Sequence, residues 1–350
     1  MTILFAILLF SLLIFVHELG HFLAAKASGV QVNEFAMFMG PAIFKKQVGE
    51  TLYSIRCIPI GGYCAMEGED QASDNPRAFG SAKWWKRLII LLAGSAMNFV
   101  TGVLIMVLVF APMTKYITPV IDQFDEGSLV YGEDKLQVGD EFVRIDGEKI
   151  YNQGDVTMIL ALNPGDVHDI VVRRNGQLVE LNDFRMEKKI FGNEETPRYG
   201  FSFSIEDATF ASNLKYSWSM VLNSLRNVRL SLQMLFSGRA SINDVSGPVG
   251  IIGQMNQTAQ SSDSAWSAFM NMLYFGGFLA LNLAVMNLLP IPALDGGRAV
   301  CLLLTAGVEA IIGKKINPKY EGYLHGAGMV ILLGFMALIM FKDIFSIFKG

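Results

Sequence analysis

The chain has 350 residues, of which 52% are hydrophobic and only 17% are charged, and its formal net charge is −4. This composition is typical of a protein that crosses a membrane several times and carries a polar insert, and it gives no reason to expect a nucleic-acid partner. The three cysteines have no metal-type spacing, and none lies in the long polar middle of the chain, so no disulfide framework is expected there.

The first apolar segment, residues 1–25, is long enough to cross a bilayer, which takes about 20 residues. No basic residue precedes it and no clear small-residue cleavage site follows it, so we expect a retained transmembrane helix rather than a signal peptide. Within it, His17-Glu18-Leu19-Gly20-His21 places two histidines on one helix face, where both can bind one Zn²⁺. Glu18 can take a proton from a water at that metal. Polar residues at membrane depth normally mark a functional site, although they could also line an ion pathway.

Residues 26–87 are predicted to be a cytosolic-side loop that contains a membrane-associated β-hairpin. Alternating patterns predict its strands at 34–44 and 51–58. The hairpin is more apolar than a solvent-exposed loop needs to be, so we expect it to lie against protein at membrane depth; an ordinary cytosolic hairpin is the alternative. An unwound substrate could add to it as a strand, which makes Tyr53 and Ile55 candidate substrate-binding residues.

A second transmembrane helix is predicted over residues 88–113. It follows Trp84 and Trp85, which are typical of a membrane interface. Small residues at 94–96 would let a neighbouring helix approach closely. Asn98 is a polar residue inside this span, where it either forms a helix–helix hydrogen bond or belongs to the site.

Residues 114–208 are predicted to be a small β-rich domain with one helix. Within it, 170–172 and 178–181 should pair across an Asn175-Gly176 turn. Residues 209–265 show amphipathic helical patterns, which we interpret as helices at the membrane surface, with soluble helices as the alternative.

The last part of the chain contains two more apolar segments. The third transmembrane helix is assigned to residues 266–298, with Pro290-Ile291-Pro292 breaking it and Asp295-Gly296-Gly297 following at once. A cytosolic-side helix and loop are expected over 299–321, and the fourth transmembrane helix with the C-terminus over 322–350.

The distribution of basic residues predicts how the chain is oriented across the membrane. The loop at 26–87 has eight Lys/Arg and the connection at 294–321 has four, whereas none precedes the first span. The positive-inside bias therefore places these two loops in the cytosol and residues 114–265 outside. In this orientation His17, His21 and Asp295 all lie toward the cytosolic side of the bilayer.

Zinc in catalytic sites commonly has three protein ligands and a fourth position open for water. Asp295 is the candidate third ligand because it reaches the depth of the two histidines, although in isolation an N-cap for the following helix would be the simpler interpretation. Two histidines compete with it. His168 lies in the polar insert on the wrong side of the membrane, and His325 opens the fourth span but has no companion motif.

The His17-Glu18-Leu19-Gly20-His21 motif, together with Asn287-Leu288-Leu289-Pro290-Ile291-Pro292-Ala293-Leu294-Asp295-Gly296-Gly297, resembles the site-2 protease family of intramembrane zinc metalloproteases, bacterial RseP-type. The stretch from Leu136-Gln137-Val138-Gly139-Asp140 to Ile145-Asp146-Gly147 resembles a PDZ domain, and the chain has room for one. The resemblance implies a polytopic α-helical membrane protein with four transmembrane helices, a membrane-associated β-hairpin and one extracytoplasmic PDZ-like α+β domain.

The same resemblance implies Zn²⁺ as cofactor, His17, His21 and Asp295 as its ligands, and Glu18 as general base. It places Asn98 and Asn287 near the site. The implied activity is cleavage of transmembrane segments of single-span membrane proteins in the bacterial inner membrane. Implied substrates are anti-sigma factors after a first cleavage and signal-peptide remnants, with a C-terminal peptide in the PDZ groove. A metal-ion transporter and a catalytically silent PDZ scaffold are the alternatives.

Overall fold

The computed structural model describes residues 2–69, 73–163, 165–192, 196–238, 247–313 and 319–349. It divides into two compact units, one formed by Met1–Ile105 with Ser224–Gly350 and the other by Met106–Asn223. Within the described residues, four helices are long and apolar enough to cross a membrane: Ile3–Ser28, Trp84–Phe110, Ala265–Asn287 and Gly322–Asp343. Each is at least as long as the roughly 20 residues that a bilayer crossing needs. The four spans predicted from the sequence therefore correspond to four helices.

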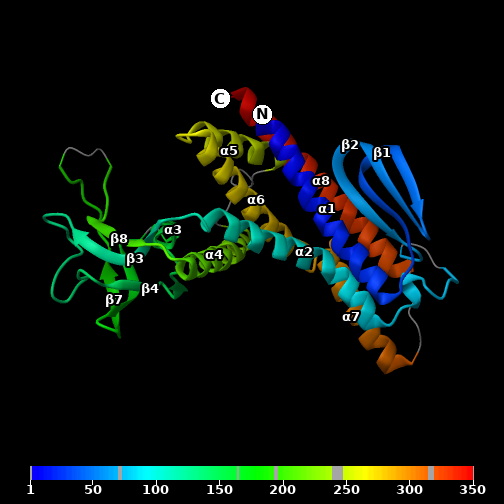
Figure 1. Cartoon of the computed structure of the whole chain (residues 1–350). Coiled ribbons are helices and arrows are strands. Elements are labelled where there is room, and N and C mark those ends of the chain that lie inside the picture. The colour runs from blue at the N-terminus through cyan, green and yellow to red at the C-terminus, as the bar shows by residue number, and fades with distance from the viewer. Residues whose placement is uncertain are drawn as a thin grey trace. The chain divides into compact units, whose positions relative to one another are not determined.

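The helices, in chain order (Figure 1), are α1 (Thr2–Ser28), α2 (Trp84–Phe110), α3 (Gln153–Leu162), α4 (Phe210–Phe236), α5 (Pro248–Gln260), α6 (Ala265–Asn287), α7 (Asp295–Ile312) and α8 (Lys319–Lys349). A short 3₁₀ helix, η1, covers Phe79–Ser81. The strands are β1 (Val32–Val48), β2 (Thr51–Met66), β3 (Lys115–Phe124), β4 (Glu141–Ile145), β5 (Glu148–Lys149), β6 (Val167–Arg174), β7 (Gln177–Arg185) and β8 (Phe201–Asp207).

The antiparallel pair β1 and β2 is longer than the predicted hairpin, and both strands are kinked so that the pair folds back on itself. Residues 34–37 pair on one side with 52–55 and on the other with 62–65. Across the sheet the segments follow the order 42–48, 51–56, 32–37 and 62–66. The kinks contain Gly40 (φ 85°) and Gly61 (φ 79°), a conformation that glycine adopts without strain. The alternation of apolar residues predicts two strands and the hairpin between them. It does not predict that residues 34–37 also pair with 62–65.

Helix α1 is the element around which the first unit packs. Strand β2 runs along it (Figure 1), and the Ser11 hydroxyl donates a 2.8 Å hydrogen bond to the carbonyl of Pro59. Helix α1 also buries Leu13 in an apolar cluster with Met255 of α5 and Met272 of α6. These contacts fix α1, with its two histidines, against both the sheet and the neighbouring helices.

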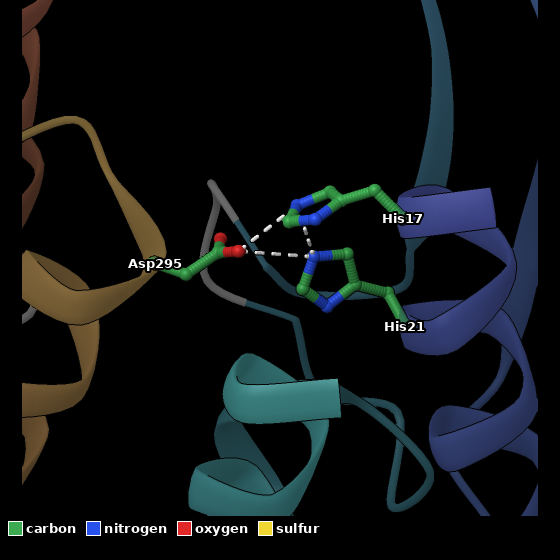
Figure 2. A group of neighbouring side chains, drawn as sticks. All are labelled: His17, His21 and Asp295. Atoms are coloured by element: carbon green, nitrogen blue, oxygen red, sulfur yellow. Dashed lines mark hydrogen bonds and ion pairs between the residues drawn. The ribbon is translucent and has the colours of Figure 1, made fainter. Parts of the chain in front are cut away.

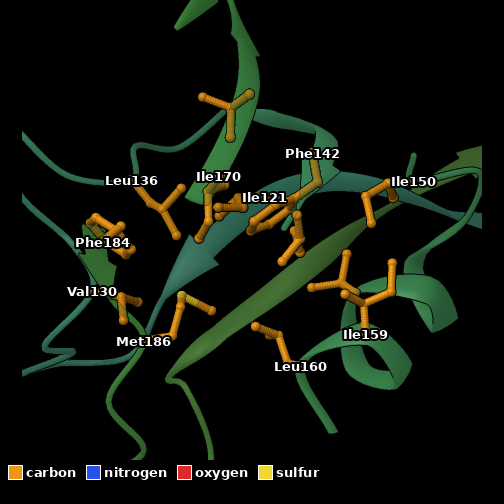
Figure 3. Packing of buried hydrophobic residues seen from close by; sticks show 13 residues of the cluster. Ile121, Val130, Leu136, Phe142, Ile150, Ile159, Leu160, Ile170, Phe184 and Met186 are labelled. Atoms are coloured by element: carbon orange, nitrogen blue, oxygen red, sulfur yellow. The ribbon is translucent and has the colours of Figure 1, made fainter. Parts of the chain in front are cut away.

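The second unit contains an α+β domain with an antiparallel sheet, whose strands follow the order β7-β6-β4-β3-β8, with β5 beside β4. Strands β6 and β7 pair across Asn175-Gly176 as predicted, and both turn residues have positive φ, as a tight hairpin requires. Helix α3 begins with a capping box between Asn152 and Asp155. Figure 3 shows the domain's buried core, whose members are Ile121, Val130, Leu136, Phe142, Ile145, Ile150, Val156, Ile159, Leu160, Ile170, Val172, Phe184 and Met186.

Candidate metal site

Three polar side chains from two distant parts of the chain converge in the first unit (Figure 2). The Nε2 atoms of His17 and His21, one turn apart on α1, lie 3.2 Å from each other. Oδ2 of Asp295, the first residue of α7, lies 3.0 Å from Nε2 of His17 and 3.3 Å from Nε2 of His21. Both histidines are buried and Asp295 is partly buried. Two imidazole nitrogens and one carboxylate oxygen aimed at a single point are a donor set that suits Zn²⁺ and leaves a fourth position open.

The far nitrogen of each imidazole also has a neighbour. Nδ1 of His21 donates a 2.8 Å hydrogen bond to the carbonyl of Ile90 on α2, which leaves the Nε2 lone pair for a metal. Nδ1 of His17 lies 3.3 Å from Nδ2 of Asn98, whose buried Oδ1 has no hydrogen-bond partner within the described residues. Rotating the Asn98 amide by about 180° would let its Oδ1 accept a hydrogen bond from Nδ1–H of His17. The oxygen and nitrogen of an amide are assigned from the hydrogen bonds around them. Asn98 therefore fits the role of orienting His17.

Gly94 of α2 lies against the two imidazoles, which fit there because glycine has no side chain. A Cβ atom at this position would lie 2.4 Å from Nε2 of His21 and 2.8 Å from Nε2 of His17. Gly20 of α1 faces α2 in the same way, since its Cβ would lie 2.4 Å from the carbonyl oxygen of Ala93. The predicted small-residue stretch at 94–96 thus permits close helix packing, but the sequence gave no sign that Gly94 borders the histidines themselves.

Asp295 is held by a compact loop between α6 and α7. The helix N-cap is Leu294, and no side chain caps the helix, so the simpler interpretation of Asp295 as an N-cap is wrong. Gly296 and Gly297 pack so closely on the backbone of residues 288–292 that no Cβ would fit. Ala293 has a positive φ of 83°, and its N–H lies 3.3 Å from Nδ1 of His325, which accepts from it.

Glu18 follows His17 on α1 and is partly buried. The kinked end of β2 approaches it: a Cβ on Gly62 would lie 3.8 Å from Cγ of Glu18. The carboxylate that the sequence predicts as general base is therefore next to the outermost segment of the β1–β2 sheet.

The other predicted residues lie elsewhere. His168 belongs to the second unit, where it hydrogen-bonds Asp146, and His325 contacts the loop at Ala293 rather than joining the three-residue cluster. Asn287 is the last residue of α6 and makes no side-chain hydrogen bond within the described part of the chain. Tyr53 and Ile55 each pair with β1 residues on both sides, so neither lies at an open edge of the sheet.

The chain is similar to known proteins over almost its whole length. The model of peptidase family M50 matches residues 5–335. The chain is 34% identical over 347 residues to a protein of Clostridium acetobutylicum named as a zinc metalloprotease, covering 98% of this chain and 97% of the relative. It is 26% identical over 432 aligned positions to the regulator of sigma-W protease RasP of Bacillus subtilis, covering 99% of each. The chain therefore belongs to peptidase family M50, the site-2 protease family, and is a multi-pass membrane zinc metalloprotease.

Proposed function

We propose that this protease hydrolyses a peptide bond within or beside the transmembrane segment of single-span membrane proteins, with His17, His21 and Asp295 as zinc ligands and Glu18 as general base. The observation that carries the proposal is the convergence of three ligand atoms within 4.8 Å of one another, two of them on the helix that also carries Glu18. A transporter would need polar groups along a path through both leaflets. A silent scaffold would have no use for a carboxylate between two ligands.

The chain's own residues divide the work. Zinc, when bound, supplies a Lewis acid that polarises the scissile carbonyl and makes a water acidic. Glu18 accepts the proton of the attacking water and later delivers it to the leaving amine. The Ile90 carbonyl and Asn98 hold the imidazoles so that their Nε2 atoms stay aimed at the metal. The Asn287 side chain makes no hydrogen bond within the described residues, and the role proposed for it is to support the site or the substrate.

A helical substrate must unwind before attack, because its carbonyls are engaged in i→i+4 hydrogen bonds. Among the described residues, the segment at 62–66 pairs with β1 on one side only, and Gly62 lies beside Glu18. We assign the strand-binding edge to this segment, which replaces Tyr53 and Ile55 in that role, since both are paired on two sides. The Ser11–Pro59 hydrogen bond inside the α1 span supports a hairpin at membrane depth.

The positive-inside bias supports a cytosolic-side active site and an extracytoplasmic domain at 114–208. We propose that this domain is PDZ-like and binds a C-terminal peptide along β8, the strand at one end of its sheet. The substrates proposed are anti-sigma factors shortened by a first protease and signal-peptide remnants. In that arrangement the domain excludes substrates whose external portion is still bulky.

The mechanism is tested with Glu18→Gln. This variant should retain about one zinc per chain and lose cleavage of a single-span substrate in detergent or liposomes, because the amide cannot accept the proton. Glu34→Gln is a matched control, since Glu34 lies in the adjacent sheet and pairs with Arg56. Full cleavage by Glu18→Gln would show that the base is another group.

The size filter is tested by excising the extracytoplasmic domain. Lys115 pairs with Asp207, so the two ends of the domain lie side by side and a short flexible linker can replace 115–207. Excision should raise cleavage of an untrimmed substrate while leaving a trimmed one unchanged. If the ratio of the two rates stays as it was, the domain has another role.

A further inference from the structure

An ion pair outside the metal cluster links the helix that carries Asp295 to the β1–β2 sheet. The guanidinium of Arg298, in the first turn of α7, donates from Nη1 to Oε1 of Glu69, which follows β2 by three residues. The two side chains are 30% and 17% exposed, so solvent screens this pair less than a pair on the open surface. The pair joins positions 229 residues apart in the sequence.

Backbone hydrogen bonds hold the chain close to both ends of this ion pair. On the α7 side, the N–H of Arg298 donates a 3.1 Å hydrogen bond to the carbonyl of Leu294, so the side chain leaves from the same helical turn as Asp295. On the sheet side, Glu67 is held by backbone hydrogen bonds with Gln31 (3.0 Å) and Phe79 (2.7 Å), two residues before Glu69. The ion pair therefore joins the first turn of α7 to the turn that follows β2.

The Arg298–Glu69 pair also completes a closed path around the metal cluster. His17 and His21 lie on α1, and β2 packs along α1. The chain then continues from β2 to Glu69, whose carboxylate holds Arg298, three residues from Asp295. Close packing of Gly296 and Gly297 fixes Asp295 to its own loop, but that loop is not thereby fixed to α1. Ala299 and Leu302 of α7 already pack in one apolar cluster with Ala25 of α1, and the ion pair adds a polar restraint between α7 and the segment that follows β2.

We propose that Arg298 is a positioning residue which, through Glu69, holds the carboxylate of Asp295 at the distance from His17 and His21 that zinc requires. The inference rests on the proposed ligand role of Asp295. Arg298 acts through its neighbours and is not itself a ligand. Metal ligands are commonly oriented by such outer partners, and the loss of one typically lowers metal affinity by 10- to 100-fold.

The test is a double-mutant cycle on the full-length protein, with zinc affinity as the readout, measured by competition with a chromophoric chelator. Arg298→Ala and Glu69→Ala should each weaken zinc binding by about 10-fold, and the double variant should be no weaker than either single variant. Arg298→Lys, which keeps the charge but not the forked geometry, should recover part of the affinity.

The control is the Arg77–Glu50 pair, a contact between the same residue types that links the β1–β2 turn to the loop before η1 and does not involve α7. Arg77→Ala and Glu50→Ala should leave zinc affinity within about 2-fold of the parent while sharing any general loss of stability. Unchanged zinc affinity in the Arg298 and Glu69 variants, or additive losses in the double variant, would overturn the proposal. Because the readout is metal binding, its outcome is separate from whether the protein cleaves the proposed substrates.

Discussion

His168 in the second unit and the pair His17 and His21 in the first are all buried, but their ring nitrogens face different groups. His168 has an acceptor at each nitrogen: Oδ2 of Asp146 lies 2.8 Å from Nδ1, and the carbonyl of Gly165 lies 2.8 Å from Nε2. Both ring nitrogens of His168 therefore face protein oxygens, and neither points at a shared metal position. In the first unit the Nε2 atoms point at each other and at a carboxylate, an arrangement that a metal ion completes.

The difference shows what separates a structural histidine from a proposed metal ligand when the sequence contains both. Burial does not decide it, and neither does a neighbouring aspartate, since Asp146 and Asp295 both contact a histidine. What decides it is whether the protein satisfies both nitrogens or only the outer one. Substitutions of single groups in the two clusters test this difference.

Asp295→Ala should cause the largest loss. Zinc binding to four protein ligands is worth roughly 10–16 kcal/mol, so one ligand's share is about 3 kcal/mol, or on the order of 100-fold in Kd. Zinc content after dialysis and cleavage rate should both collapse. Asp343→Asn is the control, because Asp343 is a buried aspartate that accepts hydrogen bonds from the N–H groups of Gly247 and Gly250 at the start of α5. If Asp295→Ala keeps its zinc, the ligand set proposed here is wrong.

Gly94→Ala should reduce zinc affinity toward the upper end of the 10- to 100-fold range of an outer-partner loss, because the new methyl group would overlap both imidazoles. Gly102→Ala, also on α2, is the matched control. Its Cβ would meet the Leu281 side chain at 2.7 Å, so it disturbs helix packing without touching a histidine. Equal zinc loss in the two variants would mean that helix packing alone causes the effect.

Asn98→Ala should weaken zinc binding by about 10-fold, since it frees the His17 ring without adding bulk. Ser95→Ala removes another buried polar group of α2, one with no hydrogen-bond partner in the described residues, and should leave zinc affinity unchanged. Isothermal titration of the metal-free protein distinguishes them. A wild-type affinity in Asn98→Ala would limit this residue to helix association.

The sequence predicted the site residues that lie together on one helix and the one that follows a helix break. His17, Glu18 and His21 lie on the same helix. The Pro290-Ile291-Pro292 stretch breaks the helix before it and so draws attention to Asp295, which follows. No local sequence pattern shows which elements of the chain pack against each other. The contacts of Gly94, of the Ile90 carbonyl and of the Arg298–Glu69 pair depend on that packing, so they were not predicted. The folded-back β1–β2 sheet was missed for a similar reason: its extra pairing is set by the kinks at Gly40 and Gly61.

The smallest expected effect belongs to the second cluster and concerns acid stability. Burial raises the pKa of Asp146, but hydrogen bonds from His168, the Asp169 N–H and Asn163 outweigh it and hold the pKa below the ordinary value of 3.8. The stability that Asp146 contributes is therefore present above pH 3.8 and is lost as the pH falls through the lower folded-state pKa.

Asp146→Asn removes this acid-sensitive contribution while keeping the turn, because Asn tolerates the positive φ of 50° at this position. Hydrogen-exchange protection of β4 and β6 in the wild type should fall by roughly tenfold, or about 1.4 kcal/mol, for each unit by which the Asp146 pKa is lowered. Asp146→Asn should lack this fall, at the cost of lower protection near neutral pH. Asp183→Asn is the matched control, an exposed aspartate with a φ of 51° in the same unit, and it should keep the wild-type pH dependence. If Asp146→Asn and the wild type lose protection in parallel on acidification, the His168–Asp146 pair does not set the acid stability of this domain.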